Sequence, residues 1–72
     1  MLEGRELNAA QCLDCLDVIE SKHVHDYVRC NCGNVAVDGG RDYIRRGFRD
    51  ESKIREILTR DEFDRLKTRD KL

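Results

Sequence analysis

The stretch Cys12-Leu13-Asp14-Cys15, followed after fourteen residues by Cys30-Asn31-Cys32-Gly33, decides the fold of this 72-residue chain. Two residues between the first cysteines let a tight turn direct both sulfur atoms at one ion. Four thiolates suit the tetrahedral coordination of zinc. The spacer has the length of a β-hairpin that returns the second pair to the first, and Gly33 allows a sharp turn whose N–H groups point at sulfur. We therefore predict that Cys12, Cys15, Cys30 and Cys32 bind one structural Zn²⁺.

The alternatives for these cysteines are two disulfides, an iron–sulfur cluster or a redox-active Cys-x2-Cys pair. The second pair is one residue shorter than the usual Cys-x2-Cys spacing of zinc sites. The polar start Met1–Glu6 lacks the apolar segment of a secretory signal, and no apolar run approaches the roughly 20 residues of a membrane span. We expect a cytoplasmic protein without membrane association, and in that reducing compartment paired cysteines favour metal binding over disulfides.

The composition predicts a thin core that needs such a metal centre. Only 39% of the residues are hydrophobic, 40% are charged and there is no tryptophan. The net charge is −1, but residues 1–40 carry three basic against seven acidic residues and residues 41–72 carry eleven against eight. This balance lacks the strongly basic character of an obligate nucleic-acid binder.

The first two thirds of the chain predict a zinc ribbon, a three-stranded antiparallel sheet over residues 8–48 that follows a loose segment 1–7. Asn8–Cys12 reads as a short strand that enters the first cysteine turn. Residues 16–30 read as a β-hairpin between the two cysteine pairs, because strand-forming residues flank a polar turn. Residues 34–37 read as the third strand, which ends at Asp38-Gly39-Gly40. The fold class is therefore a small metal-stabilised α+β domain.

The segment that follows the glycines is ambiguous between a strand and a short helix. Its apolar residues Tyr43, Ile44 and Phe48 are expected to cover the open face of the ribbon.

Residues 49–72 are expected to be helical, packed on the ribbon or projecting from it. Ile54, Ile57 and Leu58 share one helical stripe, whereas Phe63 falls opposite, which argues for a break. Thr59 with Glu62 fits a capping box, and Leu58 with Phe63 fits a hydrophobic staple. We therefore predict two short helices, at 52–58 and 60–70.

One dense basic cluster with interleaved aromatic residues lies at 41–49. Its candidate contact residues for nucleic acid or a partner are Arg41, Tyr43, Arg45, Arg46 and Arg49. Guanidinium groups suit phosphates and aromatic faces stack on bases. The alternatives are that the aromatic residues belong to the core while the arginines pair with carboxylates, or that the cluster docks an acidic protein.

His23, His25, Asp26 and Asp38 are the remaining residues with chemical potential. The two histidines could hold a second metal ion, and His25, Asp26 and Asp38 could form an acid–base group. The simpler interpretation makes them turn residues whose side chains hydrogen-bond locally.

The sequence resembles a family of very short bacterial and phage zinc-ribbon proteins that has no established function. The resemblance spans roughly residues 8–48. It rests on Cys12-x2-Cys15, Val18-Ile19-Glu20-Ser21, His25-Asp26, Cys30-x-Cys32-Gly33, Val37-Asp38-Gly39-Gly40, Tyr43 and Arg45-Arg46-Gly47. It implies four zinc-ligating cysteines and a phage or bacterial cytoplasmic setting.

A zinc ion held by four cysteines has no open position for water or substrate, so we expect a structural site. The leading functional hypothesis is a non-enzymatic module, encoded by a phage, that binds a host or phage protein and no small-molecule substrate. The second is RNA or DNA binding through Arg41–Arg49. A small hydrolase that uses His25, Asp26 and Asp38 is the third.

Overall fold

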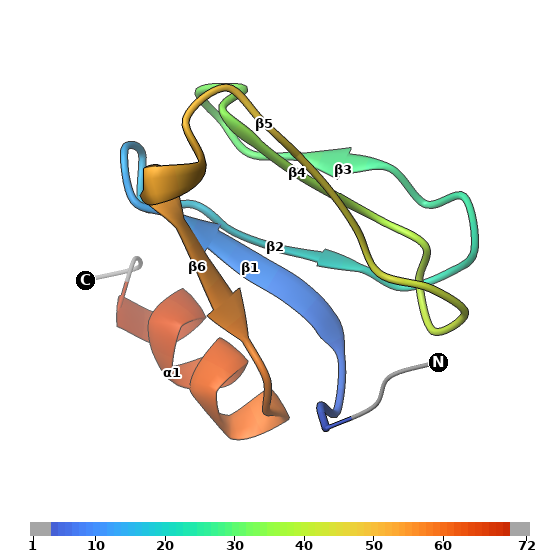
Figure 1. Cartoon of the computed structure of the whole chain (residues 1–72). Helices are drawn as coiled ribbons and strands as arrows, with labels where there is room; N and C mark the ends of the chain where they lie inside the picture. The colour runs from blue at the N-terminus through green and yellow to red at the C-terminus, as the bar shows by residue number, and fades with distance from the viewer. Residues whose placement is uncertain (1–3, 70–72) are drawn as a thin grey trace.

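The computed structural model, which describes residues 4–69, places two three-stranded antiparallel sheets face to face, with one helix outside (Figure 1). The first sheet has the order β2-β1-β6 and the second the order β3-β4-β5. The strands are β1 (Asn8–Cys12), β2 (Val18–Ser21), β3 (Val28–Arg29), β4 (Val35–Asp38), β5 (Arg45–Phe48) and β6 (Ile54–Ile57). A 3₁₀ turn η1 (Glu51–Lys53) precedes β6, and helix α1 (Arg60–Arg69) follows it. No helix within residues 4–69 is long and apolar enough to cross a membrane.

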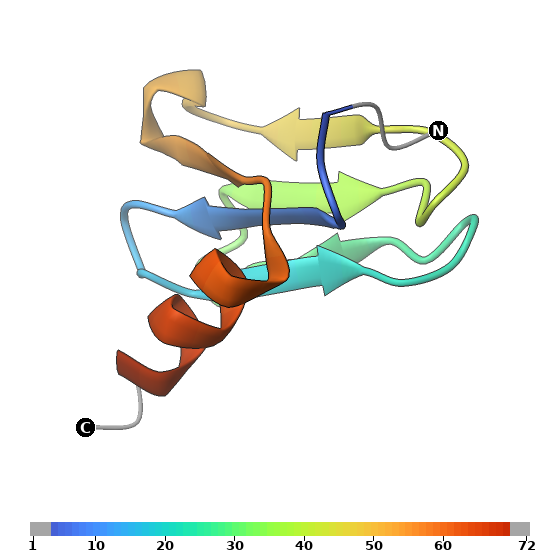
Figure 2. The same ribbon diagram turned by 90° about the horizontal axis from the view of Figure 1, so that it is seen from below.

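The first sheet carries a hydrophobic core on each of its faces. Between the sheets lie Ala10, Cys12, Ile19, Cys30, Val35 and Val37, all buried. On the other face, Leu7, Ala9, Val18 and Ile57 pack with Phe63 of α1, which lies beside β2 in Figure 2. Successive residues of a strand point to opposite faces, so Ala9 and Ala10 serve different cores.

The predicted single sheet is wrong in topology, because the structure has two sheets. Residues 16–30 do not form a hairpin: β2 pairs with β1, and β3 pairs with β4. A turn separates β2 from β3, in which Lys22 donates its backbone N–H to the Asp26 carboxylate at 2.9 Å. The Ser21 hydroxyl donates to the Asp26 carbonyl at 2.7 Å. These bonds stabilise a turn through which the chain passes from the first sheet to the second, so β2 and β3 do not pair as a hairpin.

The ambiguous segment after the glycines contains the strand β5, and its apolar residues do not cover the sheet as expected. Ile44 is 39% exposed and Phe48 is 49% exposed. The first sheet covers the inner face of the second sheet instead.

The first of the two predicted C-terminal helices is also wrong, since residues 51–57 form η1 and β6. Ile54 packs against the core between the sheets, and Ile57 packs in the core under α1. Three residues apart, two side chains share a helix face but lie on opposite faces of a strand. The three-residue spacing of Ile54 and Ile57, which suggested one helical stripe, therefore belongs to a strand that is buried on both faces.

The second predicted helix is confirmed as α1, although residue 70 lies outside the described residues. The Glu62 N–H donates to the Thr59 hydroxyl at 3.1 Å, which is the predicted N-cap. The Glu62 carboxylate reaches the N–H of Leu58 at 3.4 Å rather than that of Thr59. Leu58 is 42% exposed while Phe63 is buried. The capping half of the prediction therefore holds, whereas the two apolar side chains lie in different environments.

The start of the described chain is tied to the domain, in contrast to the loose segment expected for residues 1–7. Leu7 is buried, and the Glu6 carboxylate accepts the N–H of Arg60 at 2.8 Å. The rest of that expectation, residues 1–3, lies outside the described residues.

A buried polar cluster holds the two sheets together at the end away from the cysteines. The Asn8 amide donates to the carbonyls of Asp38 and Gly40 at 2.9 and 3.0 Å. The Gly40 N–H donates to the Ser21 hydroxyl at 2.9 Å. Gly40 has φ +54°, and a Cβ there would lie 2.1 Å from the backbone of His23. Glycine is therefore required at this close approach.

Removal of the Thr59 cap should destabilise the fold by about 1 kcal/mol. Thr59→Ala leaves the N–H of Glu62 without its side-chain acceptor. The matched control is Thr68→Ala, which lies on the same helix and donates only to the carbonyl of Asp64. Chemical unfolding measures both; equal stabilities of the two variants would contradict the cap.

Glu56→Gln should show a stability deficit that depends on pH. Burial raises the pKa of the Glu56 carboxyl, but the hydrogen bonds and charges of Arg46 and Arg5 outweigh it and lower the pKa below its ordinary value. A lowered folded pKa stabilises the protein above the unfolded pKa of about 4.3, and the gain is lost as pH falls through the folded value.

At neutral pH we expect Glu56→Gln to lower the free energy of unfolding by about 1 kcal/mol. The loss is this small because solvent partly screens the ion pairs of Glu56 with Arg5 and Arg46. Denaturant unfolding from neutral to acidic pH should show this deficit shrinking. The control Glu51→Gln should show no deficit, because the Glu51 carboxylate has no hydrogen-bond or ion-pair partner within residues 4–69. A deficit that stays constant in acid would contradict the role of the charge.

Candidate functional site

The four cysteines come from two turns at one end of the paired sheets. Cys12 ends β1 and Cys15 lies in the turn to β2, while Cys30 follows β3 and Cys32 lies in the turn to β4. All four sulfur atoms lie within 4.8 Å of one another. The Cys32 sulfur is 3.5 Å from that of Cys12 and 3.7 Å from that of Cys30. Each sheet thus supplies sulfur atoms to one cluster.

The distances in this cluster fit a single tetrahedral metal ion. Zn–S bonds of about 2.3 Å in a tetrahedron place sulfur atoms about 3.8 Å apart. A disulfide would need sulfur atoms about 2.05 Å apart, and all four cysteines are free. The predicted single metal site is therefore supported by the geometry, and the disulfide alternative is not.

Backbone N–H groups next to Gly33 stabilise the sulfur atoms. The Val35 N–H donates to the Cys30 sulfur at 3.2 Å, and the Asn34 N–H interacts with the Cys32 sulfur. Gly33 adopts φ +83°, and its own N–H bonds to the Cys30 carbonyl at 3.0 Å. The sharp turn predicted at Gly33 is present, and the two residues after it provide the sulfur-directed donors.

Two thiols of the cluster have opposite pKa shifts. Burial raises the pKa of Cys30, but donation from the Val35 N–H and from the other three thiols outweighs it and lowers the pKa to about 7. The Asn34 N–H lowers the pKa of Cys32, but burial and hydrogen bonds to the other cysteines outweigh it and raise the pKa to about 12. These opposite shifts of Cys30 and Cys32 follow from the closeness of the sulfur atoms in the cluster.

The candidate contact residues at 41–49 do not form one surface. Arg46 is half-buried and joins the sheets: it donates to the Asn8 side chain at 2.7 Å and to the Glu56 carboxylate at 2.8 Å. Arg49 donates to the carbonyl of Cys32 at 2.8 Å, which supports the second cysteine turn. Arg41 is exposed and makes a long bond of 3.4 Å to the Glu6 carbonyl. Arg46 and Arg49 therefore help to build the fold.

A different basic surface lies on the outer side of the second sheet. Arg29 and Arg45 point away from the first sheet, since their strand neighbours Val28 and Arg46 point toward it. The Arg45 guanidinium lies 6.0 Å from the centre of the Tyr43 ring, and that of Arg29 lies 5.6 Å from the Tyr27 ring. We call Tyr27, Arg29, Tyr43 and Arg45 the basic-aromatic face.

His23, His25, Asp26 and Asp38 are not gathered into a group with metal-ligand geometry. The Asp26 carboxylate accepts from Lys22, and the Asp38 carboxylate accepts from the Gly39 N–H at 2.8 Å. The His25 ring meets the Tyr43 hydroxyl at 3.4 Å. Among the described residues, the cysteines form the one cluster with metal-ligand geometry. The local-turn interpretation accounts for the positions of both carboxylates.

The sequence analysis missed the polar residues that join the sheets, two of which are buried. Asn8 and Ser21 are each 1% exposed, and Glu56 bridges Arg5 and Arg46. A signal for Asn8 was available, because an asparagine inside an otherwise apolar strand must find hydrogen-bond partners. Nothing comparable pointed to Glu56, which lies between Arg55 and Ile57 in a segment that reads as helical.

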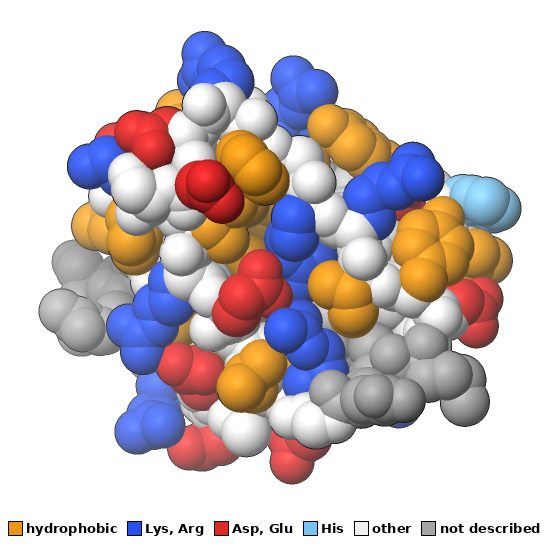
Figure 3. Space-filling view, viewed as in Figure 1, with side chains coloured by type: hydrophobic (Ala, Val, Ile, Leu, Met, Phe, Trp, Pro, Cys, Tyr) orange, Lys and Arg blue, Asp and Glu red, His pale blue; other side chains and the backbone are white. Residues whose placement is uncertain are grey.

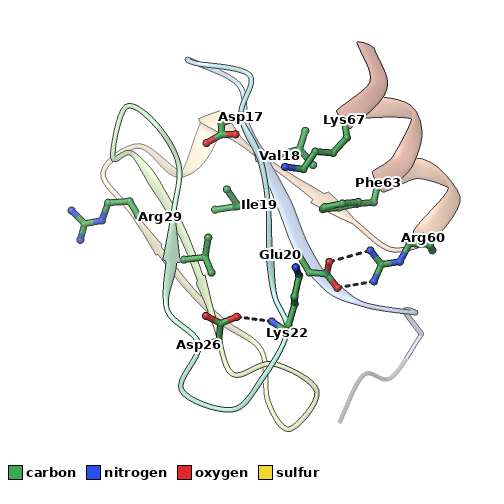
Figure 4. A pocket seen from close by; sticks show the side chains of 11 residues that line it. Asp17, Val18, Ile19, Glu20, Lys22, Asp26, Arg29, Arg60, Phe63 and Lys67 are labelled. Atoms are coloured by element: carbon green, nitrogen blue, oxygen red, sulfur yellow. Dashed lines mark hydrogen bonds and ion pairs between the residues drawn. The ribbon is translucent and has the colours of Figure 1, made fainter. Parts of the chain in front are cut away.

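A groove of about 720 Å³ lies between β2, β3 and α1 (Figure 4). Its lining consists of Asp17, Val18, Ile19, Glu20, Lys22, Asp26, Val28, Arg29, Arg60, Phe63 and Lys67. The Arg60 guanidinium makes two bonds to the Glu20 carboxylate, at 3.0 and 2.7 Å. The side chain of Arg29 points away, so this residue borders the groove without filling it (Figure 4).

The geometry defines a small α+β domain built around a four-cysteine cluster that fits one metal ion. Residues 7–48 match the family described as a domain of unknown function (DUF7695). This match covers more than half of the chain, and the protein belongs to that family. No curated protein and no solved structure matches the chain.

Loss of one sulfur should abolish metal binding. Native mass spectrometry of the purified protein should find one metal ion per chain, and none in Cys30→Ser, since four thiolates complete the tetrahedron. The matched control is Asn31→Ala between two of the ligands, whose backbone N–H bond to Asp17 at 2.9 Å is unaffected. Metal retained by Cys30→Ser, or a metal-free mass that shows oxidised cysteines, would contradict the site.

Proposed function

We propose that this protein is a non-enzymatic binding module, in which one structural Zn²⁺ fixes the fold and a protein partner binds the surface. Four cysteine ligands fill the zinc shell and leave no position for substrate, which is typical of structural sites. The observation that carries the protein-binding part is the groove beside β2, a strand at the edge of its sheet. Such an edge is a common docking element for a partner chain.

The resemblance to short bacterial and phage zinc proteins supports a bacterial cytoplasmic setting and a host or phage protein as partner. The carboxylates of Asp26 and Asp38 are occupied by backbone donors, which speaks against the hydrolase hypothesis. When the cysteines and these carboxylates serve the structure of so small a domain, the simplest way for it to act is by binding through its surface.

Nucleic-acid binding is the second candidate, and the basic-aromatic face is the observation that favours it. Arginine beside tyrosine suits phosphates and stacked bases. The net charge of −1 argues against it, and so does the interleaving of basic and acidic side chains on the face seen in Figure 3. We therefore rank it below protein binding.

Affinity capture from bacterial lysate separates the two candidates. The zinc-loaded, tagged protein should retain a specific protein after nuclease treatment, and the double variant R29A/R45A should retain it equally. Partner loss on nuclease treatment, with nucleic-acid affinity that falls steeply with salt and weakens in R29A/R45A, would favour the second candidate instead.

A further inference from the structure

The two long sides of the paired sheets differ in how they are closed. On one side η1 connects β5 to β6, and Arg46 of β5 bonds to Glu56 of β6 at 2.8 Å. On the other side β2 and β3 are the edge strands of their sheets, and the groove lies beside them. The open side therefore presents strand edges to solvent.

The edge of β2 offers unused backbone hydrogen-bonding groups. The Asp17 carbonyl accepts the Cys12 N–H at 3.0 Å, so the alternate residues Ile19 and Ser21 also turn their peptide groups toward β1. The backbone N–H and C=O groups of Val18 and Glu20 then point to the groove, where the described residues supply no partner strand. An extended peptide could pair with them as an additional strand.

The groove lining has four basic side chains, all exposed, against three acidic ones that are half-buried, and this balance favours an acidic occupant. The three carboxylates of the groove are also engaged: Glu20 with Arg60, Asp17 with the N–H of Asn31, and Asp26 with that of Lys22.

The two groove lysines are exposed, in contrast to these carboxylates. The ammonium group of Lys22 has no hydrogen-bond or ion-pair partner within residues 4–69. Lys67 rests 5.7 Å from the Phe63 ring centre and extends from α1 toward β2 (Figure 4). The positive charge that remains available in the groove is therefore that of these lysines.

We propose that the groove binds an extended acidic segment of the partner protein, which pairs with β2 and places its carboxylates beside Lys22 and Lys67. This inference rests on the proposed protein-binding function and names the chemistry of the partner. Backbone pairing with Val18 and Glu20 supplies affinity, and the lysines select acidic over basic segments.

A second copy of the chain is a weaker occupant of the same edge. Pairing of β2 with β2 around a two-fold axis places the same groove surface of both copies in one interface. The lysines of both copies would then share one interface, which is unfavourable for like charges. Charge complementarity thus favours a different, acidic chain.

The test uses the zinc-loaded full chain, labelled with ¹⁵N, and a short end-blocked peptide of alternating glutamate and valine. Titration should shift the amide signals of Val18 and Glu20, and a matched lysine–valine peptide should not. The double variant K22Q/K67Q should weaken binding about tenfold. The charge-matched control K53Q/R65Q removes the same number of charges outside the groove, from the exposed ion pairs of Lys53 with Asp14 and Arg65 with Asp61. It should bind the peptide like the wild type.

N-methylation of the peptide tests strand pairing directly. Methyl groups on one alternate set of peptide nitrogens block the bonds to β2, and those on the other set face away. One methylated peptide should therefore lose binding, and the other should keep it. Equal effects of both, shifts confined to the basic-aromatic face, or no binding would overturn the proposal.

Self-association gives a distinct result. Shifts at Val18 and Glu20 that depend on protein concentration without peptide, together with a dimer mass, would replace the acidic segment by a second copy and overturn the proposal. If the peptide titration fails but lysate capture yields a specific protein partner, the proposed protein-binding function stands without this inference. If lysate capture fails, that function is rejected even when the model peptide binds.

Discussion

The four-cysteine cluster is the interaction on which the rest of the structure depends, because it joins the two sheets at one end. Cys12 and Cys15 belong to the end of β1 and its turn, and Cys30 and Cys32 to the turn between β3 and β4. The apolar side chains between the sheets are mostly small: alanine, valine and isoleucine accompany the cysteines. A core of this size contributes little by itself in so short a chain, so we propose that a metal ion bound by the cluster supplies what packing does not.

The other end and one long side are closed by polar contacts rather than by the cysteine cluster. Asn8, Ser21 and the backbone of Gly40 close the far end, and Arg46 with Glu56 closes the side between β5 and β6. The remaining side, at β2 and β3, stays open and contains the groove. Binding is thus proposed where the fold leaves strand edges unpaired, which explains why a module of this size can offer a docking site.

Local features of the fold were predictable from the sequence, whereas the pairing of strands was not. The strand Asn8–Cys12, the cysteine cluster and the cap at Thr59 each follow from a few neighbouring residues. The strand β6 was mistaken for a helix because cores lie on both of its sides, a fact that only the tertiary structure supplies. Arg46 was named as a candidate contact residue, and the alternative that the arginines pair with carboxylates holds for it. Its partners Asn8 and Glu56 could not be identified beforehand, since they are distant in sequence.

A closed structural zinc centre is the central claim of this account, and X-ray absorption at the zinc edge of the purified protein tests it most directly. The account predicts four sulfur neighbours at about 2.3 Å and no nitrogen or oxygen neighbour. A spectrum with fewer sulfur atoms and an oxygen or nitrogen ligand would contradict it, because the site would then have a position open to water or substrate.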